Sequence, residues 1–198
     1  MKPVLALPLT QELFQSYGTV LDVSRDDVTV ITANKGSARK YLGVSEALND
    51  YSQASVPHCT GRWNLFQSKP TVPIVPAGQI MIRVDTLERH PYTTQTFTPM
   101  GRSADEPAYL VVVAPNADDD GPDWTNLKVF IAFGTQAITY DANVWHSPML
   151  TIGKPTVLTA FNYENGIMQD DCQVKTTSTP VPVVTSNELE AAIESASK

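Results

Sequence analysis

The amino-acid sequence predicts an all-β fold, a sandwich or a barrel, with a few short helices at its periphery. Three observations predict this class. Fifteen prolines are spread over the 198 residues, and the apolar segments between them are short. Apart from Met81, residues 80–85 alternate between apolar and polar side chains, which is the period of a half-buried strand. Residues 109–114 form an unbroken run of β-forming residues, which is typical of a strand buried on both faces.

Turn signals divide the remaining apolar segments into further strands. Asp-Gly-Pro-Asp at 120–123, Gly134 and Gly-Lys-Pro at 153–155 each favour a turn. Several short strands with turns between them indicate a sandwich or barrel. The additional expected strands are residues 127–133, 137–140, 149–152 and 156–161.

Three segments have the pattern of short helices. The first begins after Thr10, a good N-cap residue, and ends before Gly18, which suits a helix C-terminus. The second is residues 45–51. The third is residues 187–196, which carry an apolar stripe at helical spacing.

The length corresponds to one domain. We expect a single domain over residues 1–175 and a C-terminal extension over residues 176–198, first extended and then helical.

Charge and composition exclude several classes of function. The chain has 14 basic and 21 acidic residues, a net charge of −7, so its surface repels nucleic acid and anionic membranes. The longest apolar run has seven residues, far fewer than a membrane helix needs. The first eight residues do not resemble a signal peptide. Cys59 and Cys172 are too few for a disulfide framework, so we expect a cytoplasmic protein.

Glu88 and His90 are the first pair of residues that can carry chemistry. They are two positions apart, so on a strand both side chains leave the same face. There they can shift each other's pKa or share a metal ion. A solvated turn before Pro91 explains the same residues equally well. Gln95 follows in a dense polar stretch, where it is either a ligand for a small molecule or a hydrogen-bonded strand residue.

His146 follows Trp145 and precedes Ser-Pro, a turn that can present an imidazole beside an aromatic wall. The alternative is a packed tryptophan with an incidental histidine. A polar, basic loop at 33–40 contains Lys40, which is either a partner for a substrate carboxylate or ordinary surface. His58 has no partner nearby in sequence, and acidic neighbours make Cys172 a poor nucleophile.

Together these residues resemble a cupin, a small β-barrel in which two motifs bring metal-binding or catalytic groups together. Here Glu88-x-His90 with Gln95 and Gly101 resembles the first motif, and residues 134–146 resemble the second. Glu88 stands in place of the usual first histidine, and Gln95 in place of the usual acid. Further motifs are Glu-Arg-His-Pro at 88–91, Thr-Gln-Thr-Phe at 94–97, residues 108–114, 122–130 and 140–148, and the 34–40 loop. Taken together, these motifs resemble the ureidoglycolate lyase family.

The resemblance is strongest to the fungal members, because of Met-Gly-Arg at 100–102 and Ala-Asn-Lys-Gly at 33–36. It implies a cytosolic homodimer that cleaves (S)-ureidoglycolate to glyoxylate and urea during allantoin breakdown. For that reaction our hypothesis is that His90 is the base, that Glu88 orients it, and that His146 protonates the leaving nitrogen, although the acid and base roles of the histidines are interchangeable. The residues expected to bind substrate are Gln95, Lys40, Trp145, Asn34 and Tyr140.

The sequence leaves two questions open: whether a metal ion takes part, and which of three related functions the protein has. Glu88, His90 and His146 form a two-histidine, one-carboxylate set that can hold a divalent ion, and the resemblance suggests nickel. Gln95 is a poor fourth ligand, so a metal-free elimination is the other possibility. A ureidoglycolate amidohydrolase that releases ammonia and a non-enzymatic cupin that binds a small acid are the rival functions. No organic cofactor is expected.

Overall fold

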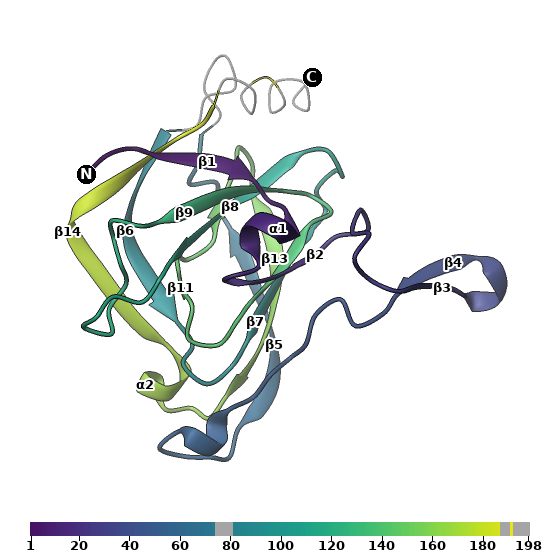
Figure 1. The fold of residues 1–198 in the computed structure, drawn as a ribbon, viewed down its shortest axis with the longest axis horizontal. Coiled ribbons are helices and arrows are strands. Elements are labelled where there is room, and N and C mark those ends of the chain that lie inside the picture. Colours follow the sequence, from purple (N-terminus) through teal and green to yellow (C-terminus); the bar gives the residue numbers. More distant parts are fainter. Residues whose placement is uncertain (74–80, 187–190, 192–198) are drawn as a thin grey trace.

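The fold is built on a seven-stranded sheet that closes on itself (Figure 1). The computed structural model describes residues 1–73, 81–186 and 191. The strand order is β11-β6-β14-β1-β9-β8-β12, and β11 also pairs with β8, which closes the sheet into a barrel. The strands of this sheet are β1 (Val4–Pro8), β6 (Met81–Arg89), β8 (Pro107–Ala114), β9 (Lys128–Phe133), β11 (Trp145–His146), β12 (Leu150–Thr151) and β14 (Gln173–Val184).

A second sheet of five strands packs against the first. Its order is β2-β10-β7-β13-β5, and all of its pairings are antiparallel. The strand β5 forms one edge of this sheet. The strands are β2 (Gly18–Leu21), β5 (Thr60–Ser68), β7 (Gln95–Met100), β10 (Ala137–Tyr140) and β13 (Thr156–Glu164).

Two hydrophobic clusters account for the two-sheet arrangement. Alternate residues of β8 point to opposite sides, so Leu110 and Val112 belong to one cluster, and Val111 and Val113 belong to the other. The first cluster fills the closed sheet. The second joins β8 and β9 to residues of the five-stranded sheet such as Phe97. This is why β8 is buried along its whole length, as its unbroken apolar sequence predicts.

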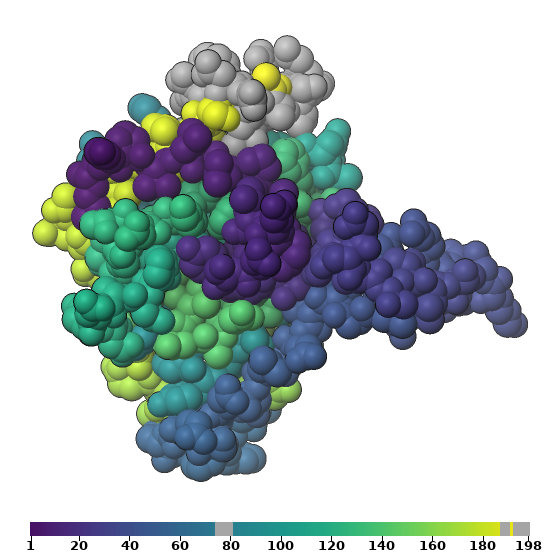
Figure 2. Space-filling model, in the orientation of Figure 1, coloured from purple at the N-terminus to yellow at the C-terminus, as the bar shows by residue number. Residues whose placement is uncertain are grey.

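A two-stranded hairpin projects from the rest of the molecule (Figures 1 and 2). It consists of β3 (Val30–Ala33), a 3-10 turn at Asn34–Gly36, and β4 (Ala38–Tyr41). We call these residues, 30–41, the arm. The sequence predicts a polar loop here, and the loop is in fact the tip of a hairpin.

Helices are few and short, as the sequence predicts. Thr10 caps α1 (Gln11–Phe14) by accepting a hydrogen bond from the amide of Leu13. The other α-helix is α2 (Met168–Asp171). The helix expected at residues 45–51 is wrong, because only a 3-10 turn at Tyr51–Gln53 forms there. The helix expected at residues 187–196 lies outside the described residues.

The predicted all-β barrel with a few short helices is confirmed, and the six strands expected from sequence all exist. The sequence did not identify β1, β2, β5, β7, β11, β14 or the two strands of the arm. Residues 173–184 form one strand, so the boundary expected at residue 175 falls inside β14. Within the described part of the chain, no helix is long and apolar enough to span a membrane.

Candidate active site

Glu88, His90 and His146 meet where the two sheets come together. Glu88 lies on β6 directly opposite His146 on β11, and His90 follows the last residue of β6. One ligand atom from each of the three side chains lies within 4.8 Å of the others. The two-residue spacing of Glu88 and His90 therefore places them together, as the strand pattern predicts.

One nitrogen of the His90 imidazole is hydrogen-bonded, and the other has no partner among the described residues. Its ring is buried, with 8% exposed, and Nδ1 lies 2.6 Å from the main-chain oxygen of Asp171. A carbonyl only accepts hydrogen bonds, so Nδ1 carries the proton and Nε2 keeps a lone pair. Burial lowers the pKa of His90, although the Asp171 carbonyl and the nearby Gln95 side chain partly oppose this shift. His90 is therefore a neutral ring with Nε2 available as a base or ligand.

His146 is arranged in the same way. Its Nδ1 lies 2.9 Å from the Val144 carbonyl oxygen and donates to it, while Nε2 lies 3.8 Å from Oε1 of Glu88. Burial, together with the neighbouring His90 ring, lowers the pKa of His146 to about 3. The ring stacks on Tyr140, with centroids 4.0 Å apart. His146 is thus also neutral at pH 7.

Glu88 is the acidic member of the cluster, and Cys172 lies beside it. Burial raises the pKa of Glu88. The thiol of Cys172 is 4.0 Å from Oε2 of Glu88. Burial and the neighbouring carboxylates of Glu88 and Asp171 raise the pKa of Cys172 to about 11, which confirms the prediction that it is a poor nucleophile.

Several buried polar atoms here have no hydrogen-bond partner among the described residues. They include Nε2 of His90 and His146, Oε1 of Gln95 and the Tyr140 hydroxyl. Gln95 and Tyr140 face each other across β7 and β10. Unpartnered buried polar atoms are rare in folded proteins, and a group of them indicates a site for a polar ligand or an ion. Gln95 and Tyr140 are therefore well placed to bind a substrate.

Trp145 does not line this cluster, contrary to the sequence prediction. It is fully buried in the first hydrophobic cluster, inside the closed sheet, and the Arg89 guanidinium lies over its ring at 4.5 Å. Trp145 and His146 are adjacent on a strand, so their side chains leave opposite faces. Only one of them can face the site, and that one is His146.

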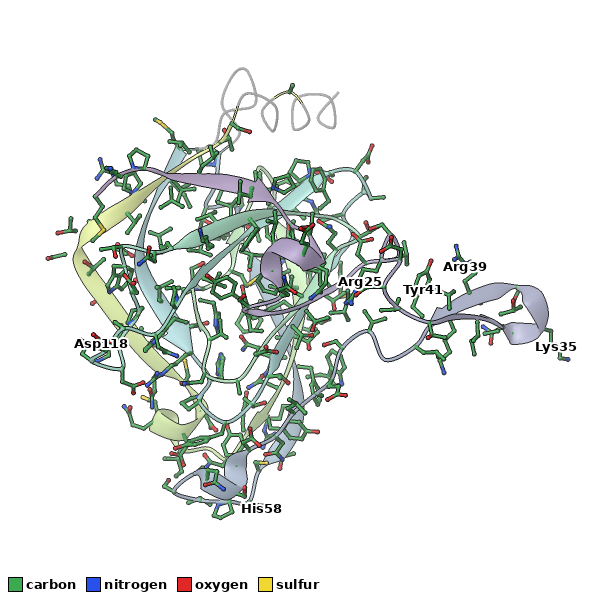
Figure 3. The ribbon with its side chains drawn as sticks, viewed as in Figure 1. Arg25, Lys35, Arg39, Tyr41, His58 and Asp118 are labelled. Carbon is green, nitrogen blue, oxygen red and sulfur yellow. The ribbon has the colours of Figure 1, made fainter. Side chains whose placement is uncertain are left out.

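Asn34 and Lys40 are not brought to the cluster within one chain. Both belong to the arm, Asn34 at its tip and Lys40 on β4. Figure 3 shows the arm residues Lys35, Arg39 and Tyr41 far from the barrel. The sequence also gave no indication of the carbonyls of Asp171 and Val144, because every residue has a carbonyl and only the fold decides which of them meets an imidazole.

Asp171 holds His90 in place and is itself held by Tyr51. The buried Tyr51 hydroxyl lies 2.7 Å from Oδ1 of Asp171, whose carboxylate also accepts the amides of Asn165 and Gly166. Burial and this carboxylate raise the pKa of Tyr51, so its hydroxyl keeps its proton and donates it.

We expect Tyr51→Phe to lower the free energy of unfolding by about 1–2 kcal/mol, because it removes a hydrogen bond to a charged acceptor. Denaturant unfolding measures this loss. Tyr92→Phe is the matched control, because its ring packs on Tyr51 and its hydroxyl has no hydrogen-bond partner among the described residues. Equal stability of the two variants would refute a role for the Tyr51–Asp171 bond.

Comparison with known proteins gives a consistent family. The profile described as "Ureidoglycolate lyase" matches residues 1–184. The ureidoglycolate lyase of Schizosaccharomyces pombe is 49% identical over 183 residues, which cover 92% of this chain and 95% of that protein. The ureidoglycolate lyase of Saccharomyces cerevisiae is 40% identical, with 78% and 81% covered. That of Salmonella paratyphi B is 33% identical, with 87% and 93% covered.

Among solved structures, dTDP-4-dehydrorhamnose 3,5-epimerase from Elizabethkingia anophelis NUHP1 aligns over 79% of each chain with a TM-score of 0.38 and 9% identity, a likeness too distant to bear on the chemistry. The two fungal relatives are more similar to the chain than the bacterial one, which agrees with the fungal character of its motifs. With a family profile over nearly the whole length and relatives above 30% identity at high coverage, the chain belongs to the ureidoglycolate lyase family.

Proposed function

We propose that the chain is a carbon–nitrogen lyase that cleaves ureidoglycolate into glyoxylate and urea, a step of allantoin breakdown. Its family membership supports this activity. The structural observation that carries the proposal is the buried group of two neutral imidazoles and one carboxyl whose free atoms point at one another. Such a group can move a proton within a small polar substrate while excluding water.

The reaction requires one proton to move from oxygen to nitrogen. The reacting carbon of ureidoglycolate carries a hydroxyl, a carboxylate and a ureido nitrogen. Removal of the hydroxyl proton lets the carbon–oxygen double bond form while the carbon–nitrogen bond breaks. The departing nitrogen takes up a proton and leaves as urea. The carbon skeleton becomes glyoxylate, and no net proton or electron is consumed.

His90 is our candidate for the proton carrier. Its Nε2 lone pair has no partner among the described residues, and the Asp171 carbonyl fixes the tautomer that leaves it free. Because burial lowers its pKa, the imidazolium formed by taking the hydroxyl proton readily gives that proton to the leaving nitrogen. One imidazole can therefore serve as base and then as acid.

His146 is a poorer proton donor than its sequence position predicts. Its neutral Nε2 has no proton to give, and its Nδ1 proton is engaged by the Val144 carbonyl. We therefore assign His146 and Glu88 to holding the substrate or an ion next to His90. Gln95 and the Tyr140 hydroxyl are our candidates for hydrogen bonds to the ureido and carboxylate groups, since both have unpartnered atoms there.

The same residues fit a divalent metal ion. His90 and His146 each present a free Nε2 while their Nδ1 protons are donated to carbonyls, which is the usual outer-shell arrangement for metal-bound histidines. Glu88 supplies the carboxylate, and nickel is among the ions that such a set accepts. When bound, the ion would act as a Lewis acid toward the substrate's oxygens. It would also occupy the Nε2 lone pair of His90, so metal binding by His90 and proton transfer by His90 are alternative arrangements of the same site.

Metal binding predicts a measurable stabilisation. Adding Ni²⁺ to metal-free protein should raise its melting temperature, because a ligand that binds only the folded state stabilises it. His146→Ala should abolish the rise, while His58→Ala, which changes an exposed histidine outside the cluster, should retain it. Equal shifts in all three proteins would place the ion elsewhere. Calorimetric titration gives the stoichiometry, expected to be one ion per chain.

Two further features of the proposal are a homodimer and a cytoplasmic location. The location is supported by the two cysteines, both of which are free thiols.

Product analysis tests the activity directly. Purified protein is given racemic ureidoglycolate, and urea, ammonia and glyoxylate are measured together against the spontaneous rate. Equal amounts of urea and glyoxylate would establish the lyase. Ammonia without urea would indicate an amidohydrolase. No acceleration by folded protein supplied with Ni²⁺ would leave a non-enzymatic binding protein as the better description.

A further inference from the structure

The arm makes few contacts with its own barrel. Its strands β3 and β4 pair with each other and form a separate two-stranded sheet. Its extensive contacts are internal, between β3, β4 and the turn that joins them. In Figure 2 the arm extends as a narrow projection beyond the rounded body. An isolated two-stranded hairpin is only marginally stable in water, so this geometry indicates that the arm packs on something other than its own chain.

The base of the arm is tied to the barrel, so its direction is defined. Arg25 donates hydrogen bonds to the carbonyls of Val20, before the arm, and Val44, after it. The hydroxyl of Ser45 lies 2.8 Å from that of Thr139 on β10. Both chain segments that lead to the arm are thus anchored, and the arm is held away from its own active site.

The arm and the rest of the chain have opposite charges. The arm contains Lys35, Arg39 and Lys40 and no acidic residue. The remaining residues therefore contain 11 basic and 21 acidic side chains. Opposite charges attract the arm toward the barrel of another copy of this chain.

The candidate active site lacks the charge that the arm carries. The substrate of the proposed reaction has a carboxylate, which proteins normally pair with lysine or arginine. Among the described residues, no lysine or arginine forms a hydrogen bond or salt bridge with the side chains of Glu88, His90, His146 or Gln95. Arg89 is adjacent in sequence, but its guanidinium is bonded to Asp120 and Gln173 and packs on Trp145.

A second copy also has a surface to dock on. The edge strand β5 exposes 69% of Trp63 and 72% of Leu65, which lie on one face because they are two residues apart. Exposed apolar residues on an edge strand favour association with another chain.

We infer that the chain forms a dimer in which the arm of each copy reaches the active site of the other and supplies a cation for the substrate carboxylate. This inference rests on the proposed function. It assigns Lys35, Arg39 and Lys40 to the partner's site.

Complementation between two defective variants tests the exchange. One variant carries K35A, R39A and K40A and keeps an intact catalytic cluster. The other carries His146→Ala and keeps an intact arm. The two are co-expressed with different affinity tags, and the mixed dimer is isolated by two successive purifications. Cleavage of ureidoglycolate is then measured for wild type, for each variant alone and for the mixed dimer.

We expect the arm variant alone to lose at least about tenfold in kcat/KM, as for loss of a charged hydrogen bond. We expect His146→Ala alone to lose at least as much, because it removes a member of the catalytic cluster. In the mixed dimer, one site has both an intact cluster and an intact arm from its partner. It should therefore recover about half of the wild-type activity, as one of two symmetric sites. If arms serve their own chain, both sites of the mixed dimer are defective and no activity returns, which overturns the inference.

Other outcomes are equally decisive. A monomeric wild type in sedimentation velocity, failure to isolate a mixed dimer, or an arm variant as active as wild type would each overturn the inference. An inactive wild type would instead refute the proposed function. The matched control replaces Lys2, Lys69 and Arg83 by alanine, which removes the same charge from exposed sites outside the arm and should leave kcat/KM unchanged. Circular dichroism checks that each variant is folded.

Discussion

Replacing His90 by alanine is expected to lower kcat by about 10²–10⁴, the usual contribution of a proton-transfer group. The variant removes the only imidazole that the geometry assigns to moving the substrate proton, while Glu88 and His146 remain. Initial rates of urea release at saturating ureidoglycolate, with and without added Ni²⁺, measure the effect.

His58→Ala is the matched control for this variant. His58 is exposed, and the metal-competent cluster does not include it, so we expect wild-type kcat. Thermal unfolding of both variants separates loss of chemistry from loss of fold. A decrease of less than tenfold in a folded His90→Ala protein would remove His90 from the proton-carrying role.

Gly18→Ala is expected to lower the free energy of unfolding by about 3 kcal/mol or more, from steric overpacking and an unfavourable backbone conformation together. The φ of Gly18 is +144°, a backbone conformation that residues other than glycine rarely adopt. An added Cβ would also collide with the carbonyl oxygen of Thr139. Gly18 also pairs with Tyr140, whose ring stacks on His146, so the displacement would reach the active site. Denaturant unfolding and urea release measure the two effects.

Gly101→Ala separates the two causes. Gly101 also has a positive φ, +72°, but an added Cβ there would meet no atom within 4 Å. Its substitution should lower the free energy of unfolding by about 1–2 kcal/mol, from the unfavourable backbone conformation alone. Gly18→Ala and Gly101→Ala with the same stability would show that the contact with Thr139 relaxes without cost.

The local sequence predicted the structure correctly where a feature depends on a short pattern of neighbouring residues. The unbroken apolar run at 109–114 predicted a strand buried on both faces, and β8 is buried throughout. Thr10 predicted the start of α1. The Glu-x-His spacing predicted two side chains on one strand face, and Glu88 and His90 do lie together.

Local sequence failed where distant segments decide the structure. The strand β14 has a polar first half, and it is held in place by pairing with β6, more than 80 residues earlier. The arm has only four residues per strand, too few for a clear alternating pattern. Residues 45–51 have the composition of a helix, but Leu48 instead accepts a hydrogen bond from the Thr94 amide.

The sequence by itself determined the all-β class, the family, and the three residues, Glu88, His90 and His146, that form the candidate active site. These depend on residue types and short spacings, which the chain carries locally. The tertiary structure alone decided that Trp145 faces away, that two carbonyls fix the imidazole tautomers, and that the arm stands clear of its own site. Each of these depends on which distant segments meet, and that is set by the packing of the two sheets and not by any local pattern.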